Sequence, residues 1–172
     1  MNTRILPLLT ALILAILTAC VRDVHTTTAD DGAIALVGQT LPQFEVTTTD
    51  GSRVSTPQLA GRPSVIVLFH TDCSDCRREL PTLQRLYGEY APRATFLCIS
   101  RAEGTDSVTG YWQENGLTLP VSAQADRSVY ALFARHTIPR VYVADASLRI
   151  RSAFATRASE KDLRAAIEAT MQ

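Results

Sequence analysis

Two cysteines three residues apart are the part of this sequence best suited to chemistry. Cys73 and Cys76 directly follow the apolar run Val65–Phe69, which predicts a strand buried on both faces. Leucines and tyrosines then recur at helical spacing, which places both cysteines on the first turn of a helix. Free N–H groups and the helix dipole favour a thiolate there, and the thiolate is the reactive form. Because the spacing also permits a small disulfide, the motif indicates redox chemistry.

The pattern Cys73-x-x-Cys76-x-x-Glu79-x-Pro81 resembles the thioredoxin superfamily, specifically its envelope-anchored TlpA/ResA-like thiol–disulfide oxidoreductases. The resemblance spans Val37 to the C-terminus, about the size of one domain. It implies an α/β thioredoxin-like fold, with a central mixed sheet flanked by helices. An N-terminal hairpin and a helical insertion are the additions that this branch of the superfamily implies.

The resemblance also implies roles for individual residues. Cys73 is expected to attack a disulfide, Cys76 to resolve the resulting mixed disulfide, and Glu79 to shuttle protons. The pair Ile138-Pro139 matches a second family feature, a cis proline beside the cysteines. Its neighbour is expected to offer backbone hydrogen bonds to an extended substrate, as a strand edge does.

Glu79 also has an interpretation from its position alone. It lies three residues after Cys76 on the same helix face, and partial burial would raise its pKa and suit it to proton relay. The alternative is a solvated helix carboxylate that pairs with Arg78 or Arg85.

Acidic residues flank the first cysteine where the family usually has an aromatic residue. Asp72 and Asp75 surround Cys73, and a like charge nearby disfavours a thiolate. Arg77 and Arg78 oppose this effect, but they lie deeper in the helix. We therefore expect a reducing cysteine pair, since a less stable thiolate means a less stable dithiol form.

Other uses of the cysteines are weaker alternatives. A closed zinc site needs four ligands, and the chain has no second Cys-x-x-Cys pair. A Cu(I)-binding metallochaperone would use Cys73, Cys76 and a histidine, either His70 or His136. A redox-inactive binding module is a third class, against which the presence of both cysteines argues. We expect no metal site and no bound cofactor.

The N-terminus predicts export. Residues 1–19 read as a signal peptide, with one early arginine and an apolar run over 5–17. The run ends in Leu-Thr-Ala-Cys20, which resembles a bacterial lipobox and predicts lipidation of Cys20. Ordinary signal-peptidase cleavage, with Cys20 incidental, is the alternative. Val21 after the cysteine favours the outer membrane by analogy with known sorting rules.

The remaining chain divides into a tether and one domain. Residues 20–36 are polar and without periodicity, which predicts a flexible tether, and 37–172 form the thioredoxin-like domain. The net charge of +0 argues against nucleic acid as a partner. We expect a monomer, lipid-anchored and facing the periplasm, that acts on exported proteins with disulfides and receives electrons from a membrane thiol reductase.

The elements expected around the motif follow thioredoxin order. The turn Asp50-Gly51 predicts a hairpin between 44–47 and 53–55. Cys98, within the predicted strand 94–100, is expected to be a core residue. Further expected elements are a helix at 105–115, a strand at 117–121, a helix at 126–134, strands at 141–143 and 148–150, and a closing helix capped by Ser159.

Overall fold

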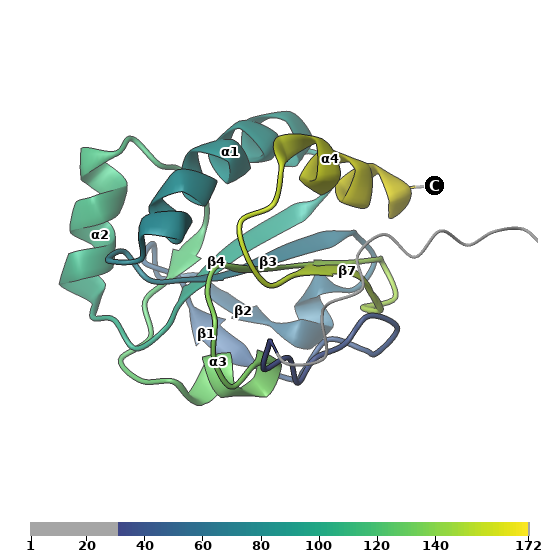
Figure 1. Cartoon of the computed structure of the whole chain (residues 1–172), viewed down its shortest axis with the longest axis horizontal. Coiled ribbons are helices and arrows are strands. Elements are labelled where there is room, and N and C mark those ends of the chain that lie inside the picture. Colours follow the sequence, from purple (N-terminus) through teal and green to yellow (C-terminus); the bar gives the residue numbers. More distant parts are fainter. Residues whose placement is uncertain (1–30, 172) are drawn as a thin grey trace, which may run out of the picture.

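A five-stranded sheet with helices on both faces forms the centre of the molecule (Figure 1). The computed structural model describes residues 31–171. The strands are β1 (Glu45–Thr47), β2 (Arg53–Ser55), β3 (Ser64–Phe69), β4 (Thr95–Ser100), β5 (Val121–Ser122), β6 (Arg140–Ala144) and β7 (Ile150–Phe154). The helices are the short 3-10 helix η1 (Thr56–Leu59), α1 (Ser74–Tyr90), α2 (Thr105–Glu114), α3 (Ser128–Phe133) and α4 (Glu160–Ala169).

The central sheet is mixed, in the order β5-β4-β3-β6-β7. The middle strand β3 runs parallel to β4 and antiparallel to β6, which in turn pairs antiparallel with β7. The strands β1 and β2 form a separate hairpin, in which Gly51 takes the positive φ of 87° that its turn needs. This arrangement confirms the expected thioredoxin-like fold with an added N-terminal hairpin.

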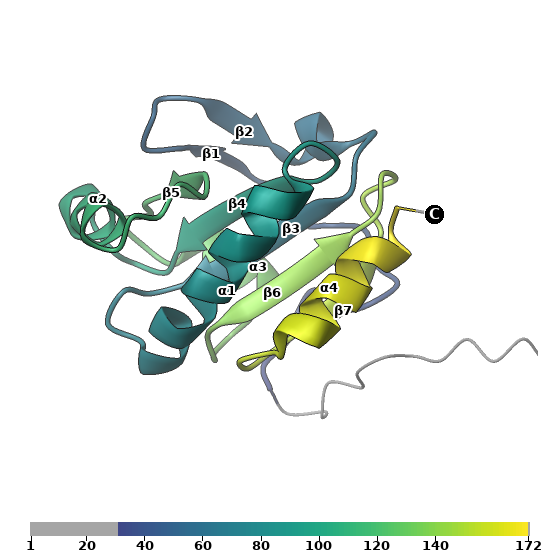
Figure 2. The ribbon, with the colours of Figure 1, turned by 90° about the horizontal axis from the view of Figure 1, so that it is seen from above.

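Alternate residues of β3 face two separate layers of the core. Val65, Val67 and Phe69 belong to a cluster with the buried sides of α1, α2 and α4. Ile66 and Leu68 belong to a second cluster with α3 and β1. Figure 2 shows α1 and α4 side by side over one face of the sheet. Since helices or the hairpin cover both faces, all six residues of β3 are buried, as its continuous apolar run predicts.

Two strand boundaries differ from the sequence expectations. The last strand covers 150–154 and not 148–150, because Leu148 has a φ of 68° and its N–H donates to the carbonyl of Asp145, at 2.9 Å. Leu148 is therefore part of the turn that joins β6 and β7. The strand expected at 117–121 is reduced to Val121–Ser122, since the N–H groups of Thr118 and Leu119 bind a side-chain oxygen of Gln84 instead.

The packed part of the chain begins before the expected domain boundary at residue 37. Ala35 is 4% exposed, and the N–H groups of Ile34 and Ala35 donate to the carbonyl of Phe133, at 2.8 and 3.0 Å. Residues 31–36, which the sequence assigned to a tether, thus pack against the domain. The predicted signal peptide and Cys20 lie outside the described residues. Among residues 31–171, no helix is both long and apolar enough to cross a membrane.

Candidate redox site

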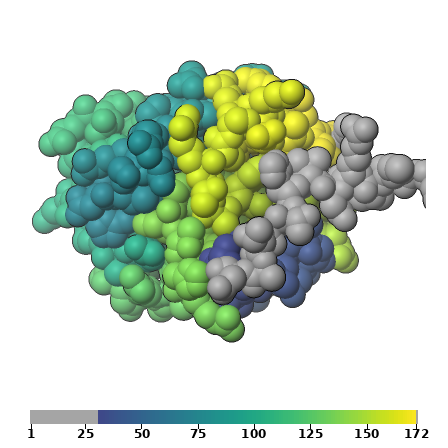
Figure 3. All heavy atoms as spheres, in the orientation of Figure 1, coloured from purple at the N-terminus to yellow at the C-terminus, as the bar shows by residue number. Residues whose placement is uncertain are grey.

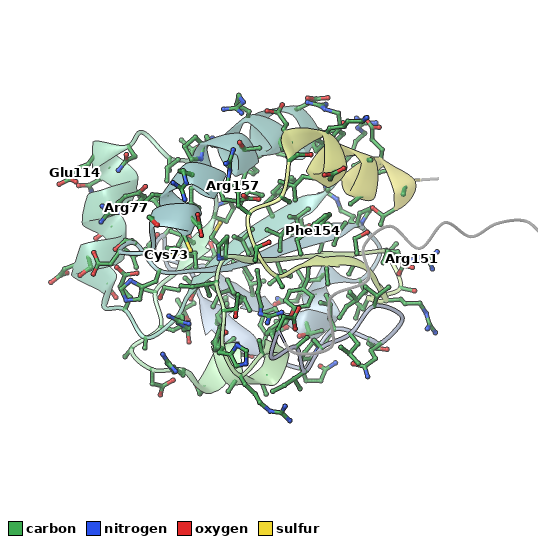
Figure 4. All side chains as sticks on the ribbon, viewed as in Figure 1. Cys73, Arg77, Glu114, Arg151, Phe154 and Arg157 are labelled. Atoms are coloured by element: carbon green, nitrogen blue, oxygen red, sulfur yellow. The ribbon has the colours of Figure 1, made fainter. Side chains whose placement is uncertain are left out.

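The two cysteines lie where the chain passes from β3 into α1, as expected. Cys73 is the N-cap residue of the helix, and its Sγ accepts a hydrogen bond from the N–H of Cys76, at 3.3 Å. Both are free thiols; Cys76 is fully buried, while Cys73 is partly exposed at the N-terminal end of α1 (Figure 4). The pair therefore combines a sulfur that a substrate can reach with a sulfur that only its neighbour can reach.

The buried thiol is held in its neutral form. Burial raises the pKa of Cys76 well above its usual value, and the neighbouring Cys73 adds to this effect. Hydrogen bonding to the His70 backbone and the positive charge of Arg101 pull the pKa of Cys76 downward, but they do not offset its burial. Attack by Cys76 at neutral pH therefore needs a base that removes its proton.

Glu79 lies one turn further along α1 and is buried, with only 1% exposed. The N–H of Ala158, in the loop before α4, lies 3.2 Å from each of its carboxylate oxygens. Burial raises the pKa of Glu79 from 4.5 to about 7, although the hydrogen bond from Ala158 and the charge of Arg157 oppose this rise. A carboxyl group with this pKa can both accept and release a proton near neutral pH.

The alternative of a solvated Glu79 paired with an arginine does not match the structure. Arg78 pairs with Asp75 on the exposed side of α1, and Arg85 pairs with Glu160 of α4, at 2.7 Å. Both arginines are therefore occupied by other carboxylates, and Glu79 points to the buried side.

The acidic residues beside Cys73 are each paired with an arginine, which corrects the electrostatic argument from the sequence. Asp72 pairs with Arg77, at 3.3 Å, and Asp75 pairs with Arg78. Arg77 reaches back from the helix because its Nε also donates to the carbonyl of the loop residue Thr71. The four charges around the cysteine thus sum to zero. Neither carboxylate is unopposed, so the structure does not support the electrostatic reason for expecting a reducing potential.

The predicted proline loop meets the cysteines. The Ile138–Pro139 peptide bond is cis, which confirms the expectation. Cys73 Sγ lies 3.8 Å from the carbonyl oxygen of Ile138. The loop therefore places a backbone carbonyl next to the partly exposed sulfur.

Glu103 is a buried part of the site that the sequence analysis missed. Only 7% of it is exposed, and its carboxylate accepts hydrogen bonds from the N–H of Thr71, at 3.0 Å, and from the Thr71 hydroxyl. The Nδ1 atom of His70 is 3.8 Å from the same carboxylate. The signal lay in the topology: β3 and β4 are parallel, so the residues that follow them meet at one edge of the sheet.

His70 and His136, the histidines that the structure describes, do not complete a metal site with Cys73 and Cys76. Nδ1 of His70 accepts from the N–H of Asp72, at 3.1 Å, and Nδ1 of His136 lies 3.0 Å from the hydroxyl of Thr137. Within the part of the chain that the structure describes, no group of three or more histidine, cysteine or acidic side chains is arranged to hold a metal ion. Cys98 is fully buried in β4, as expected of a core residue.

The fold and its Cys-x-x-Cys helix start define a thiol–disulfide oxidoreductase of the thioredoxin superfamily, of the TlpA/ResA-like type. Residues 37–153 match the AhpC/TSA family, and the chain belongs to that family. Among curated proteins, it is 27% identical over 137 residues to the "Thiol-disulfide oxidoreductase ResA" of Oceanobacillus iheyensis, covering 77% of this chain and 71% of the relative.

Solved structures support the same fold. A solution structure of a putative protein disulfide isomerase from Bacteroides thetaiotaomicron aligns with a TM-score of 0.76 at 22% identity, covering 81% of this chain and 92% of that one. The crystal structure of a thiol:disulfide interchange protein of the thioredoxin family from Chlorobium tepidum aligns with a TM-score of 0.71 at 24% identity, covering 80% and 99%. At these identities the likeness establishes the fold.

Proposed function

We propose that this protein reduces disulfides in exported envelope proteins through a Cys73/Cys76 dithiol–disulfide couple. The thiolate of Cys73 attacks a client disulfide, which forms a mixed disulfide and releases one client thiolate. The thiolate of Cys76 then attacks the sulfur of Cys73 and releases the second client thiolate. Two electrons pass to the client, and Cys73 and Cys76 are left joined by a disulfide.

Glu79 supplies the proton transfer in this scheme. It takes the proton of the Cys76 thiol as that sulfur attacks, and it returns the proton to the departing client thiolate. The observation that carries the proposal is that a buried thiol and a buried carboxyl with a pKa of about 7 lie three residues apart on the buried side of α1. A solvated carboxylate with an ordinary pKa of 4.5 would be a weaker base for a thiol.

The proposed setting is the bacterial cell envelope. The signal-peptide pattern and Cys20 support an exported protein that is lipid-anchored and faces the periplasm. Each turnover leaves the two cysteines oxidised, and they are the only electron store that the scheme requires. A membrane thiol reductase would therefore restore the dithiol. Ile138, beside the sulfur of Cys73, would offer its backbone to an extended client segment.

Trapping the mixed disulfide tests the proposal. A Cys76→Ser variant, mixed with oxidised envelope proteins, should accumulate client adducts through Cys73 that dithiothreitol releases. Matched Cys73→Ser protein keeps the buried thiol but should form no such adducts. Equal adduct yields from the two variants, or none from either, would count against the assigned roles.

A further inference from the structure

A buried arginine joins the N-terminal segment to the loop that faces Cys73. Arg140 is the first residue of β6, directly after Pro139, and only 1% of it is exposed. Its Nε lies 3.2 Å from the carbonyl oxygen of Thr137 and 3.3 Å from that of His136. Its Nη2 donates to the carbonyl of Asp31 and, at 3.1 Å, to that of His136, and it lies 3.4 Å from the Asp31 carboxylate.

The N-terminal segment follows the same loop for several residues. Ala33 pairs with Ala134 as an isolated antiparallel bridge, and the carbonyl of Gly32 accepts from the N–H of Arg135, at 2.8 Å. Gly32 has a φ of 76°, and a Cβ atom at this position would lie 2.8 Å from the ring of His136. Figure 3 shows this purple segment directly beside green residues of the α3–β6 region. The contact is therefore close and specific to glycine.

The loop itself has a conformation that needs such support. Thr137 has a φ of 76°, which is unfavourable for a β-branched residue. Its carbonyl accepts from the hydroxyl of Tyr130, at 2.9 Å, in addition to Arg140. The next carbonyl along the chain is that of Ile138, which lies 3.8 Å from Cys73 Sγ. Two donors to the Thr137 carbonyl thus fix the peptide group that directly precedes Ile138, the residue expected to contact the substrate.

We propose that Arg140, braced by residues 31–33, is a positioning residue that holds the Ile138 carbonyl ready for an extended peptide around the client disulfide. The proposal rests on the proposed function, in which Ile138 pairs with the client backbone. Arginine suits this task because its planar guanidinium reaches several carbonyls at once. The carboxylate of Asp31 offsets the cost of burying its charge. The client-binding loop is therefore incomplete without the N-terminal segment.

The experiment compares two disulfides that differ only in the residues on either side of the cysteine. One is a short flexible peptide whose single central cysteine carries a thionitrobenzoate group. The other is N-acetylcysteine methylamide with the same group. Attack by the Cys73 thiolate on the cysteine sulfur forms the mixed disulfide and releases coloured thionitrobenzoate in both cases. The ratio of the two second-order rate constants then measures what the neighbouring residues of the peptide contribute.

The reduced full-length protein is tested as wild type, Arg140→Lys and Gly32→Ala. Arg149→Lys is the matched control, because Arg149 is an exposed arginine that donates to the carbonyl of Gly38, outside residues 31–33. Thermal unfolding of each variant shows that it is folded. If Arg140→Lys does not fold, Gly32→Ala carries the same comparison.

We expect the peptide-to-small-molecule ratio to fall about tenfold in Arg140→Lys and Gly32→Ala, the size of losing one or two hydrogen bonds. The rate with the small disulfide should change by less than about twofold, and Arg149→Lys should match wild type. An unchanged ratio in the folded variants, or an equal fall in the control, would overturn the positioning role of Arg140 but not the proposed function. A wild type that releases no thionitrobenzoate from either compound would overturn the proposed function as well.

Discussion

The backbone N–H of Ala158 lies 3.2 Å from both carboxylate oxygens of Glu79, so a single donor from the α4 side holds the buried acid of α1. This one hydrogen bond favours the ionised form, but burial outweighs it and leaves the pKa of Glu79 at about 7. Both protonation states are therefore populated at neutral pH. The buried thiol of Cys76, whose pKa burial also raises, lies one helical turn away on the same buried face.

Replacing Glu79 by glutamine should slow resolution by Cys76. The glutamine keeps an oxygen for the Ala158 N–H but cannot accept the proton, so the rate at pH 7 should fall at least about tenfold. The measurement is the second step after a thionitrobenzoate label is placed on Cys73, followed against pH. Wild type should show an inflection near pH 7 that the variant lacks. Glu114→Gln, an exposed acid of α2, is the control, and an unchanged profile in Glu79→Gln would make Glu79 a structural residue.

The raised pKa of Glu79 also predicts a pH-dependent stability. Because its pKa is about 7 when folded and near 4.5 when unfolded, the folded state binds more protons between these values. The free energy of unfolding should therefore fall as the pH rises from about 4.5 to about 7, by up to about 3 kcal/mol. Urea unfolding at pH 5 and pH 8 measures this loss, which Glu79→Gln should remove. A variant that loses as much stability as wild type would show that other groups cause it.

Because Asp72 and Arg77 are paired beside Cys73, replacing one of them should change the reduction potential more than replacing both. Asp72→Asn leaves Arg77 unpaired near the sulfur, which favours the thiolate and so the dithiol form, and the reduction potential should rise. Because both side chains are largely exposed, the shift should be well below the roughly 30 mV that about 1.4 kcal/mol produces. Adding Arg77→Gln should return the potential toward wild type. A double variant that shifts further upward would contradict the pairing.

The proposed lipid anchor at Cys20 can be tested by fractionation. Cys20→Ala should abolish lipidation and leave the protein soluble or uncleaved, without loss of disulfide reduction by the domain. Membrane fractionation together with intact mass measures both properties. Wild-type protein that fractionates as soluble and shows no acyl mass would refute the anchor.

Local sequence signals predicted much of the fold, and long-range pairings account for what they missed. The apolar run of β3, the Asp50-Gly51 turn and the cysteines on the first turn of α1 all depend on neighbours in the chain, and the structure has them as expected. The contact between Arg140 and Asp31 joins residues 109 positions apart, and Glu103 binds Thr71 across 32 positions. The spacing of apolar residues along the chain cannot indicate pairs so far apart in the sequence.

The charge pairing at the site was missed for a different reason. Arg77 follows Cys76 in the helix, so the sequence places it away from Cys73. Its long side chain instead folds back to the carbonyl of Thr71 and the carboxylate of Asp72. The direction of a flexible, exposed side chain depends on the loop it meets, and that loop is set by the tertiary fold. Leu148 was missed because its backbone takes a positive φ in the turn before β7, which the apolar side chain does not indicate.

A redox titration of the full-length protein in glutathione buffers tests whether Cys73 and Cys76 form a redox-active pair. After equilibration, free thiols are alkylated, and the mass and the linked peptides are determined. We expect Cys73 and Cys76 to lose their alkylation together in one transition and to be recovered as a single linked peptide. Because a protein that reduces client disulfides must itself be a good reductant, the midpoint should lie nearer to the roughly −270 mV of thioredoxin than to the roughly −120 mV of DsbA. If Cys73 and Cys76 stay alkylated at every glutathione ratio, or if the midpoint lies near that of DsbA, the proposed reductase function is contradicted.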